Sequence, residues 1–330
     1  MSDLLFSLNI ILPMAILMAM GYIFKQIGFF SEAFVRGGMK LCFYVLLSSS
    51  LFKNLYDSSL ADLPIKLIVF VLIFILLDFA VGVIAARILA DNKRQKGIII
   101  QGIFRSNFAY IGIPLASMMF TQSELVSTTA SRISLLSMFV IPVFNVLSVI
   151  ALIVFNENKD GEKLLNKTIR NIAKNPCIIS IFLGIMVLLF RSAVPSASFF
   201  IKEHLNPIYK VIGYFASMST PLSLILVGAS LDFSHSVANI AKLAKIVAIK
   251  NLIYPAFVLV VAYLLMDFDG PDYASLVSTF ATSTAVASAV MASELDGDGD
   301  LASEIVIYTT LFSIFSLLII IYGLKAAGCL

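Results

Sequence analysis

The stretch RSNFAYIGIPLASMMF, residues 105–120, is the most informative part of the sequence, because it is almost long enough to cross a membrane yet contains residues that interrupt a helix. Gly112 and Pro114 lie in its middle, and proline removes a backbone donor and clashes with the preceding turn. Freed backbone groups cannot face lipid, so a break must be buried in protein or line a cavity. We expect that break at residues 112–114. The alternative is that Pro114 only kinks a packing helix, since Gly and Pro are frequent in transmembrane helices.

A second stretch, FATSTAVASAVMASE at residues 280–294, has a similar small and polar centre but no proline. Its central hydroxyls belong to Ser283, Thr284 and Ser288. Such hydroxyls can bond back to the helix and bend it, or face a wet cavity. Small residues also allow close helix packing, so the sequence leaves both interpretations open.

The composition indicates that these stretches lie in a membrane protein. Of the 330 residues, 60% are hydrophobic and 13% are charged, against about 45–50% and about 25% in soluble chains. The excess apolar surface must face a lipid bilayer, where helices satisfy their own backbone polar groups. No basic tract with interleaved aromatic residues is present, which argues against nucleic acid as a partner.

Ten segments have the length and apolar character of membrane spans, which need about 20 residues each or slightly fewer. The N-terminal segment is too long for a signal peptide and is interpreted as the first span. The sequence therefore predicts an all-α integral membrane protein. The predicted spans are 4–24, 41–52, 64–90, 106–123, 133–156, 176–190, 211–231, 251–266, 273–293 and 305–324.

The loop charges predict the orientation of these spans. Lys and Arg gather in alternate connections, such as 87–96 and 159–174, whereas connections such as 57–62 and 267–272 are acidic. Cytoplasmic loops carry the excess of Lys and Arg. We therefore expect a multi-pass protein of the cytoplasmic (inner) membrane with both termini outside.

The one long polar stretch predicts how the chain is divided. It separates a first unit of five spans (1–155) from a second (176–330), with a cytoplasmic linker at 156–175. If two units with an odd number of spans share a fold, the second must insert upside down. Such inverted repeats are common in secondary transporters.

Two ionisable residues lie inside predicted spans. Asp78 is in the middle of FILLDFAVG, and Lys250 begins KNLIYP near the end of the eighth span. Intramembrane charges usually mark a pathway, a pair or a proton site, so a pairing of Asp78 with Lys250 is a hypothesis. The alternatives are a purely structural pair for Asp78 and snorkelling for Lys250.

The sequence lacks the combinations of residues that catalysis or metal binding would need. His204 and His235 lie in loops without companion ligands, so no metal or cofactor is expected. Neither HExxH nor GxSxG is present, and no histidine lies within a span. We therefore do not expect an enzyme, and no catalytic residue is predicted.

The chain resembles the auxin efflux carrier family, which includes the plant PIN proteins and bacterial malate and malonate permeases. The resemblance runs through nearly the whole chain, and the order and spacing of the motifs carry it. The central motif is NFAYIGIPL at residues 107–115. The others are ILPMAILMAMGYIFKQIGFFSE (11–32), LCFYVLLSSSLF (41–52), KNPCIISIFLG (174–184), STPLSLILVGASL (219–231), KNLIYP (250–255) and ASELDGD (292–298).

This resemblance implies two inverted five-helix repeats, with broken helices 4 and 9 that cross near the membrane centre, as in bile-acid and sodium–proton transporters. An organic anion would bind at the crossing. The chain departs from the family at Ser283, where proline is common, which predicts a shallower bend in helix 9. The residues expected to bind substrate are Asn107, Tyr110, Gly112, Pro114, Asn175, Ser283, Thr284 and Ser288, with Asp78 and Lys250 as coupling or structural charges.

The expected function is secondary transport of a small organic anion by alternating access. The substrate would be a carboxylate or dicarboxylate such as malate or malonate, or an auxin-like weak acid. An anion channel and a ligand sensor that moves nothing are the alternatives on the same fold. The sequence leaves open whether transport is coupled to protons, with Asp78 as the proton carrier, or to sodium ions. It also leaves open whether the protein forms a homodimer.

Overall fold

A computed structural model describes residues 2–58, 64–156, 170, 174–193, 200–233, 240–294 and 297–330. The described residues form helices joined by short connections. Among them, the one isolated β-type pairing is an antiparallel bridge between Ser106 and Thr284. The predicted all-helical fold is confirmed.

The first five predicted spans correspond to the helices up to Asn156. The second span is a continuous helix with a π-helical turn in its middle, and the fourth is interrupted. The elements are α1 (Ser2–Gln26), α2 (Glu32–Leu41), the π-helix η1 (Cys42–Leu47), α3 (Ser48–Asp57), α4 (Ile65–Leu89), α5 (Lys93–Phe104), the π-helix η3 (Phe108–Gly112), α6 (Ile113–Met118) and α7 (Ser123–Asn156).

The second five spans follow in the same order, again with a π-helical turn and an interrupted helix. Most of the predicted linker at 156–175 lies outside the described residues, and the division into two repeats stays a prediction. The elements are α9 (Pro176–Ala193), α10 (Phe200–His204), α11 (Asn206–Ala229), α12 (Ile240–Ala248), the π-helix η4 (Ile249–Ile253), α13 (Tyr254–Leu265), α14 (Gly270–Phe280), α15 (Ala287–Glu294) and α16 (Gly299–Ala326).

Seven helical segments of the described chain are long and apolar enough to cross a membrane without interruption. The other three predicted spans are the second, fourth and ninth. The second is longer than predicted: its helix starts at Glu32, because the Ser31 side chain caps it by accepting from the Phe34 N–H. The fourth also begins earlier than predicted, at Lys93.

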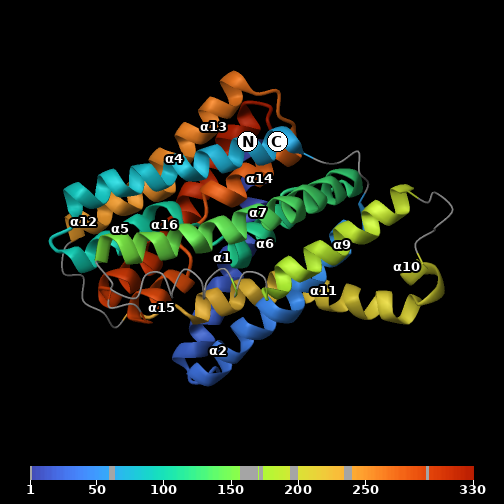
Figure 1. Cartoon of the computed structure of the whole chain (residues 1–330), viewed down its shortest axis with the longest axis horizontal. Coiled ribbons are helices and arrows are strands. Elements are labelled where there is room, and N and C mark those ends of the chain that lie inside the picture. Colours follow the sequence, from blue (N-terminus) through green and yellow to red (C-terminus); the bar gives the residue numbers. More distant parts are fainter. Residues whose placement is uncertain are drawn as a thin grey trace.

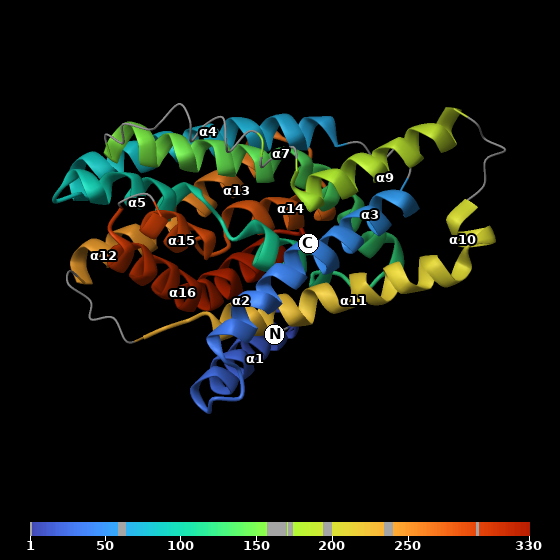
Figure 2. The same ribbon diagram turned by 60° about the horizontal axis from the view of Figure 1, so that its bottom comes forward.

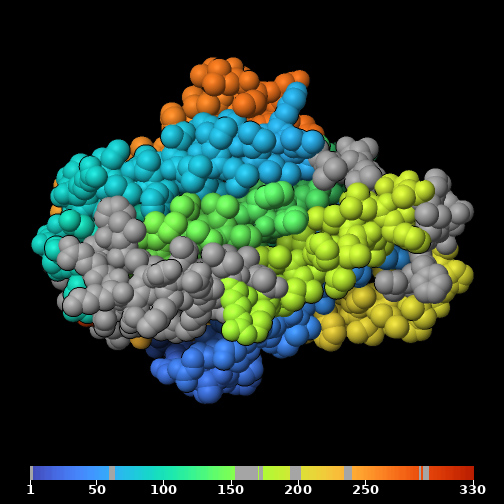
Figure 3. All heavy atoms as spheres, viewed as in Figure 1, coloured from blue at the N-terminus to red at the C-terminus, as the bar shows by residue number. Residues whose placement is uncertain are grey.

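The outer surface shows why these helices need a bilayer. Helix α4 lies along the face of the molecule shown in Figure 3. The exposed large apolar side chains of α4 include Ile65, Val69, Ile73 and Ile84. A contiguous apolar surface of this kind has no favourable contact with water. It matches the lipid-facing surface of a membrane span.

The helices pack into two groups. Helices α1, α3, α9 and α11 pack on one another, while α5 packs against α4, α7 and α16. Figures 1 and 2 show α2 and α11 on the opposite side of the molecule from α4 and α13. The first and last helices also meet, and the Lys325 ammonium lies 4.5 Å from the centroid of the Phe6 ring. The first and last helices of the described chain therefore lie together near its two termini.

Two glycines allow α1 and α11 to touch backbone to backbone. A Cβ atom added to Gly228 would lie 1.8 Å from the Met18 carbonyl oxygen, and one added to Gly21 would lie 1.8 Å from the Ile225 carbonyl oxygen. Small residues at helix interfaces permit such approaches in membranes. This contact fixes one group of helices as a unit.

The two helix interruptions differ from their predicted positions. The fourth helix breaks at Arg105–Asn107, not at Gly112–Pro114, because the π-helical turn η3 runs directly into α6 and accommodates Pro114 without an interruption. The ninth helix is fully interrupted between Phe280 and Ala287, so the prediction of a shallow bend is wrong. Its break is stabilised by pairing with the first.

Candidate functional site

The two interrupted segments lie against each other and pair through their backbones. The Asn107 N–H donates to the Ser283 carbonyl at 2.7 Å, and the Ala285 N–H donates to the Arg105 carbonyl at 3.0 Å. Backbone groups freed by a helix break need partners when water is excluded. Each break therefore supplies hydrogen-bond partners for the free backbone groups of the other. The two segments pair antiparallel, as segments from inverted repeats would.

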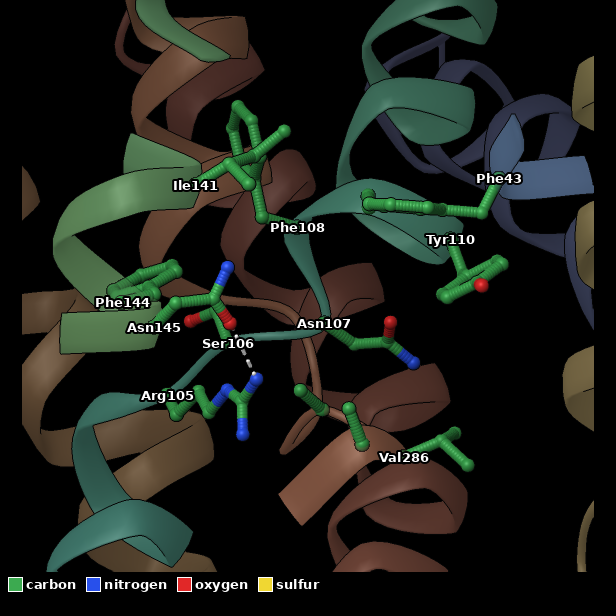
Figure 4. Close-up of a pocket in the computed structure, with 13 residues that line it drawn as sticks. Phe43, Arg105, Ser106, Asn107, Phe108, Tyr110, Ile141, Phe144, Asn145 and Val286 are labelled. Carbon is green, nitrogen blue, oxygen red and sulfur yellow. Dashed lines mark hydrogen bonds between the residues drawn. The ribbon is translucent and has the colours of Figure 1, made fainter. Parts of the chain in front are cut away.

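A cavity of about 220 Å³ lies beside this pairing (Figure 4). It could hold about seven waters at about 30 Å³ each, which suits a small ligand rather than a drug-sized one. The lining is mainly apolar with a few polar groups, as in typical ligand pockets. Its residues are Phe43, Arg105, Ser106, Asn107, Phe108, Ala109, Tyr110, Ile141, Phe144, Asn145, Ala285, Val286 and Ala287.

Two helix N-termini open onto this cavity. The continuous helical segment η3–α6 begins at Phe108 and α15 begins at Ala287, and both residues line the cavity. The first N–H groups of a helix lack intrahelical partners and carry partial positive charge. No side chain caps η3. The cavity therefore favours an anion.

Asn107 and Tyr110 are the predicted site residues that line the cavity. Asn107 is 2% exposed, and its Nδ2 has no hydrogen-bond partner. A buried, unsatisfied amide donor costs free energy that a ligand acceptor can recover. The Tyr110 hydroxyl donates to the Met39 carbonyl at 3.2 Å, and Figure 4 shows its ring close to Phe43.

Gly112 and Pro114 lie behind the cavity and are not among its lining residues. A Cβ atom on Gly112 would lie 2.5 Å from the Ser278 carbonyl oxygen of α14. Gly112 therefore lets η3 pack closely against α14. Pro114 is buried at the start of α6. Both residues shape the segment that carries Asn107.

None of the three hydroxyl residues predicted for the second segment lines the cavity, and among their side chains that of Thr284 forms a hydrogen bond across to the first segment. The Thr284 hydroxyl donates to the Gly102 carbonyl at 2.6 Å, and its N–H donates to the Thr309 hydroxyl at 3.1 Å. Ser283 and Ser288 are buried, and their Oγ atoms have no partner. Thr284 and Ser288 line a separate void with no room for a water molecule.

Asn175 is also outside the cavity lining. Its Oδ1 accepts from the Cys177 N–H at 2.9 Å at the start of α9. This is the geometry of a helix N-cap. Its nearest connection to the site runs through Cys177, whose Sγ donates to the carbonyl of Phe43 at 3.4 Å.

The two intramembrane charges lie on the other side of the paired segment. The Lys250 ammonium donates to the Ser106 hydroxyl at 2.5 Å, and both Lys250 and Asp78 are 1% exposed. The described side chains of Asp78 and Lys250 form no direct ion pair within 4.0 Å. Asp78 Oδ1 has no hydrogen-bond partner. Lys250 therefore contacts the paired segment, whereas its pairing with Asp78 stays a prediction.

Arg105 is a site residue that the sequence reasoning passed over. It is 6% exposed, ends α5 and lines the cavity. Figure 4 shows its guanidinium turned toward Asn145, whose Oδ1 accepts at 2.9 Å. An arginine inside a span is a functional candidate by default, and that signal was present in the quoted stretch.

A cavity between two interrupted helices, deep in an apolar helical molecule, is typical of a membrane transport protein. The family described as "Membrane transport protein" matches residues 6–321. The chain belongs to this family, which is the auxin efflux carrier family that the motifs resemble.

A curated relative is similar over almost the same length. It is 22% identical over 315 residues, which cover 94% of this chain and 96% of that protein. It is described as an "Uncharacterized transporter" of Methanothermobacter thermautotrophicus (strain ATCC 29096 / DSM 1053 / JCM 10044 / NBRC 100330 / Delta H). The protein is therefore a multi-pass membrane transporter rather than a member of an enzyme family.

Proposed function

We propose that this transporter is a secondary carrier for a small organic anion, with a carboxylate bound in the cavity beside the paired breaks. The observation that carries the proposal is the unpartnered, buried Nδ2 of Asn107 at a cavity lined by two helix N-termini. Neutral donors and the partial positive charge of helix ends both favour the binding of an anion.

The size of the cavity supports a short-chain acid as the substrate. A volume of about 220 Å³ accommodates a molecule such as malonate or malate together with some water. The apolar part of the lining, with Phe43, Phe108 and Phe144, would contact the carbon chain. An auxin-like acid would fill more of the cavity with its ring.

Alternating access would follow from movement of one helix group against the other. The group held by the α1–α11 glycine contact would stay fixed, and the group containing both interrupted helices would move. Because the breaks satisfy each other, they can move together without exposing unpaired backbone groups. Inverted-repeat transporters move in this general way around a central site.

Uptake into proteoliposomes tests the proposal. The purified protein would be reconstituted and given labelled malonate or malate under imposed proton or sodium gradients, with protein-free liposomes as the control. We expect saturable uptake that unlabelled carboxylates compete away, and indole-3-acetate as a competitor ranks the auxin-like alternative. A folded protein that moves none of these acids under any gradient would contradict the proposal.

A further inference from the structure

We propose that Arg105 is the residue that selects for the charge of the transported anion, by pairing with a second carboxylate that Asn107 does not reach. The inference rests on the proposed function and deepens it. It predicts that the cavity prefers a dianion to a monoanion of the same size.

Arg105 is a buried cation without a counter-charge in the described part of the chain. Its contacts there are with neutral groups: Gln101 Oε1 at 3.2 Å, Met291 Sδ at 2.8 Å and Asn145 Oδ1 at 2.9 Å. Burying a charge that is not paired is costly. Such a charge inside a membrane span is usually kept for function.

The guanidinium also has N–H donors that none of these three contacts uses. Arginine carries five N–H donors, and three contacts account for its Nη1 and Nη2 partners. The neutral oxygens of Gln101 and Asn145 hold the guanidinium plane in place without cancelling its charge. An arriving carboxylate can therefore use the remaining donors in charge-assisted hydrogen bonds.

The extended backbone at the break places Arg105 and Asn107 at one cavity. Successive side chains of an extended segment point to opposite faces. Ser106 also lines the cavity, but its hydroxyl is engaged by Lys250, while its two neighbours present N–H donors there. Figure 4 shows the two groups apart, with Arg105 near Asn145 and Asn107 nearer to Tyr110 and Val286. Two separated polar groups suit a ligand with a carboxylate at each end.

A purely structural role for Arg105 makes a different prediction. Its contacts tie the end of α5 to α7 and α15, so a structural arginine would hold those helices together whatever the ligand. Asn145→Asp separates the two roles, because it places a carboxylate against the guanidinium. That change strengthens the helix contact but cancels the charge that the ligand would meet.

The test compares malonate with its half-amide, malonamate, which has nearly the same shape and one negative charge fewer. Binding of each to the purified protein in detergent is measured by displacement of labelled malonate, and uptake is measured in proteoliposomes. The variants are Arg105→Gln and Asn145→Asp. Arg191→Gln is the matched control, because Arg191 donates to the Tyr56 carbonyl and does not line the cavity.

We expect wild type and Arg191→Gln to bind malonate about 10- to 100-fold more tightly than malonamate, the usual effect of one hydrogen bond to a charged group. Arg105→Gln and Asn145→Asp should both lose that preference while still binding malonamate. Equal loss for both ligands in Arg105→Gln, or an unchanged preference in Asn145→Asp, would overturn the proposal. A wild type that binds no dicarboxylate would overturn it as well.

The carrier function and the role of Arg105 can fail separately. If wild type binds malonate with the expected preference but moves none, the carrier function fails and the role of Arg105 stands. If wild type transports malonate and both variants keep the preference, the carrier function stands and the role of Arg105 fails.

Discussion

The backbone N–H of Asn107 lies 2.7 Å from the carbonyl oxygen of Ser283, although 176 positions separate the two residues in the chain. This bond joins the interrupted helix of the first five spans to that of the second five. It holds the Asn107 side chain at the cavity, with its Nδ2 unpaired. The geometry of the site therefore depends on contacts between distant parts of the sequence.

Asn107→Ala should weaken the binding of a carboxylate by roughly tenfold or more, because the ligand loses the free amide donor. The backbone bond to Ser283 does not need the side chain, so folding should be preserved. Displacement of labelled malonate measures the affinity, and thermal unfolding in detergent checks the fold.

Asn206→Ala is the control for this variant. Asn206 is an exposed residue whose side chain donates to the Lys202 carbonyl, away from the cavity. It should bind malonate like wild type. Normal affinity in Asn107→Ala would remove Asn107 from the substrate site.

Gly228→Ala should destabilise the protein by about 1–3 kcal/mol, since the added methyl group must push α11 away from the Met18 carbonyl of α1. Thermal unfolding in detergent measures the change. Gly37→Ala provides the contrast, because nothing lies within 4 Å of a Cβ atom there and alanine favours a helix. If both variants unfold at the wild-type temperature, the backbone contact between α1 and α11 is not tight.

Asp78→Asn should abolish stimulation of uptake by a proton gradient, if Asp78 carries the coupled proton. Asparagine keeps the size of the side chain but cannot exchange a proton, so exchange of labelled for unlabelled substrate should persist. Asp267→Asn, at an exposed position, should behave like wild type. Stimulation by a proton gradient that survives in Asp78→Asn would assign proton coupling to another group.

Cys329, next to the C-terminus, should react with a membrane-impermeant maleimide in intact cells. Cys42 and Cys177 are buried, whereas Cys329 is partly exposed next to the C-terminus. With both termini outside, as the loop charges predict, Cys329 is labelled without permeabilisation, and Cys329→Ser abolishes the signal. Labelling that requires permeabilised cells would reverse the predicted orientation.

Hydrophobic patterning was enough to predict a helical membrane protein, because the requirement for apolar spans acts on each segment separately. The position of the first break was not predictable in the same way. Pro114 is the residue of this stretch expected to break a helix. The π-helical turn η3, directly before α6, accommodates it without an interruption. The actual break at 105–107 contains no proline.

The second break depends on tertiary contacts that patterning cannot detect. Ser283 and Thr284 are released from the helix because Asn107, Gly102 and Thr309 supply their backbone or hydroxyl partners. For the same reason the predicted site combined residues that line the cavity with residues that support the fold elsewhere. Asn107 and Tyr110 line the cavity, while Asn175 caps a helix away from it.

Substrate counterflow tests whether the protein is a carrier with Asn107 at its substrate site. Proteoliposomes loaded with unlabelled malonate are diluted into a trace of labelled malonate, with wild type and Asn107→Ala compared. A carrier with a single alternating site predicts transient accumulation of label by wild type, competed by malate and strongly reduced in Asn107→Ala. Label that only equilibrates, at a rate that never saturates, would contradict a carrier and indicate a channel.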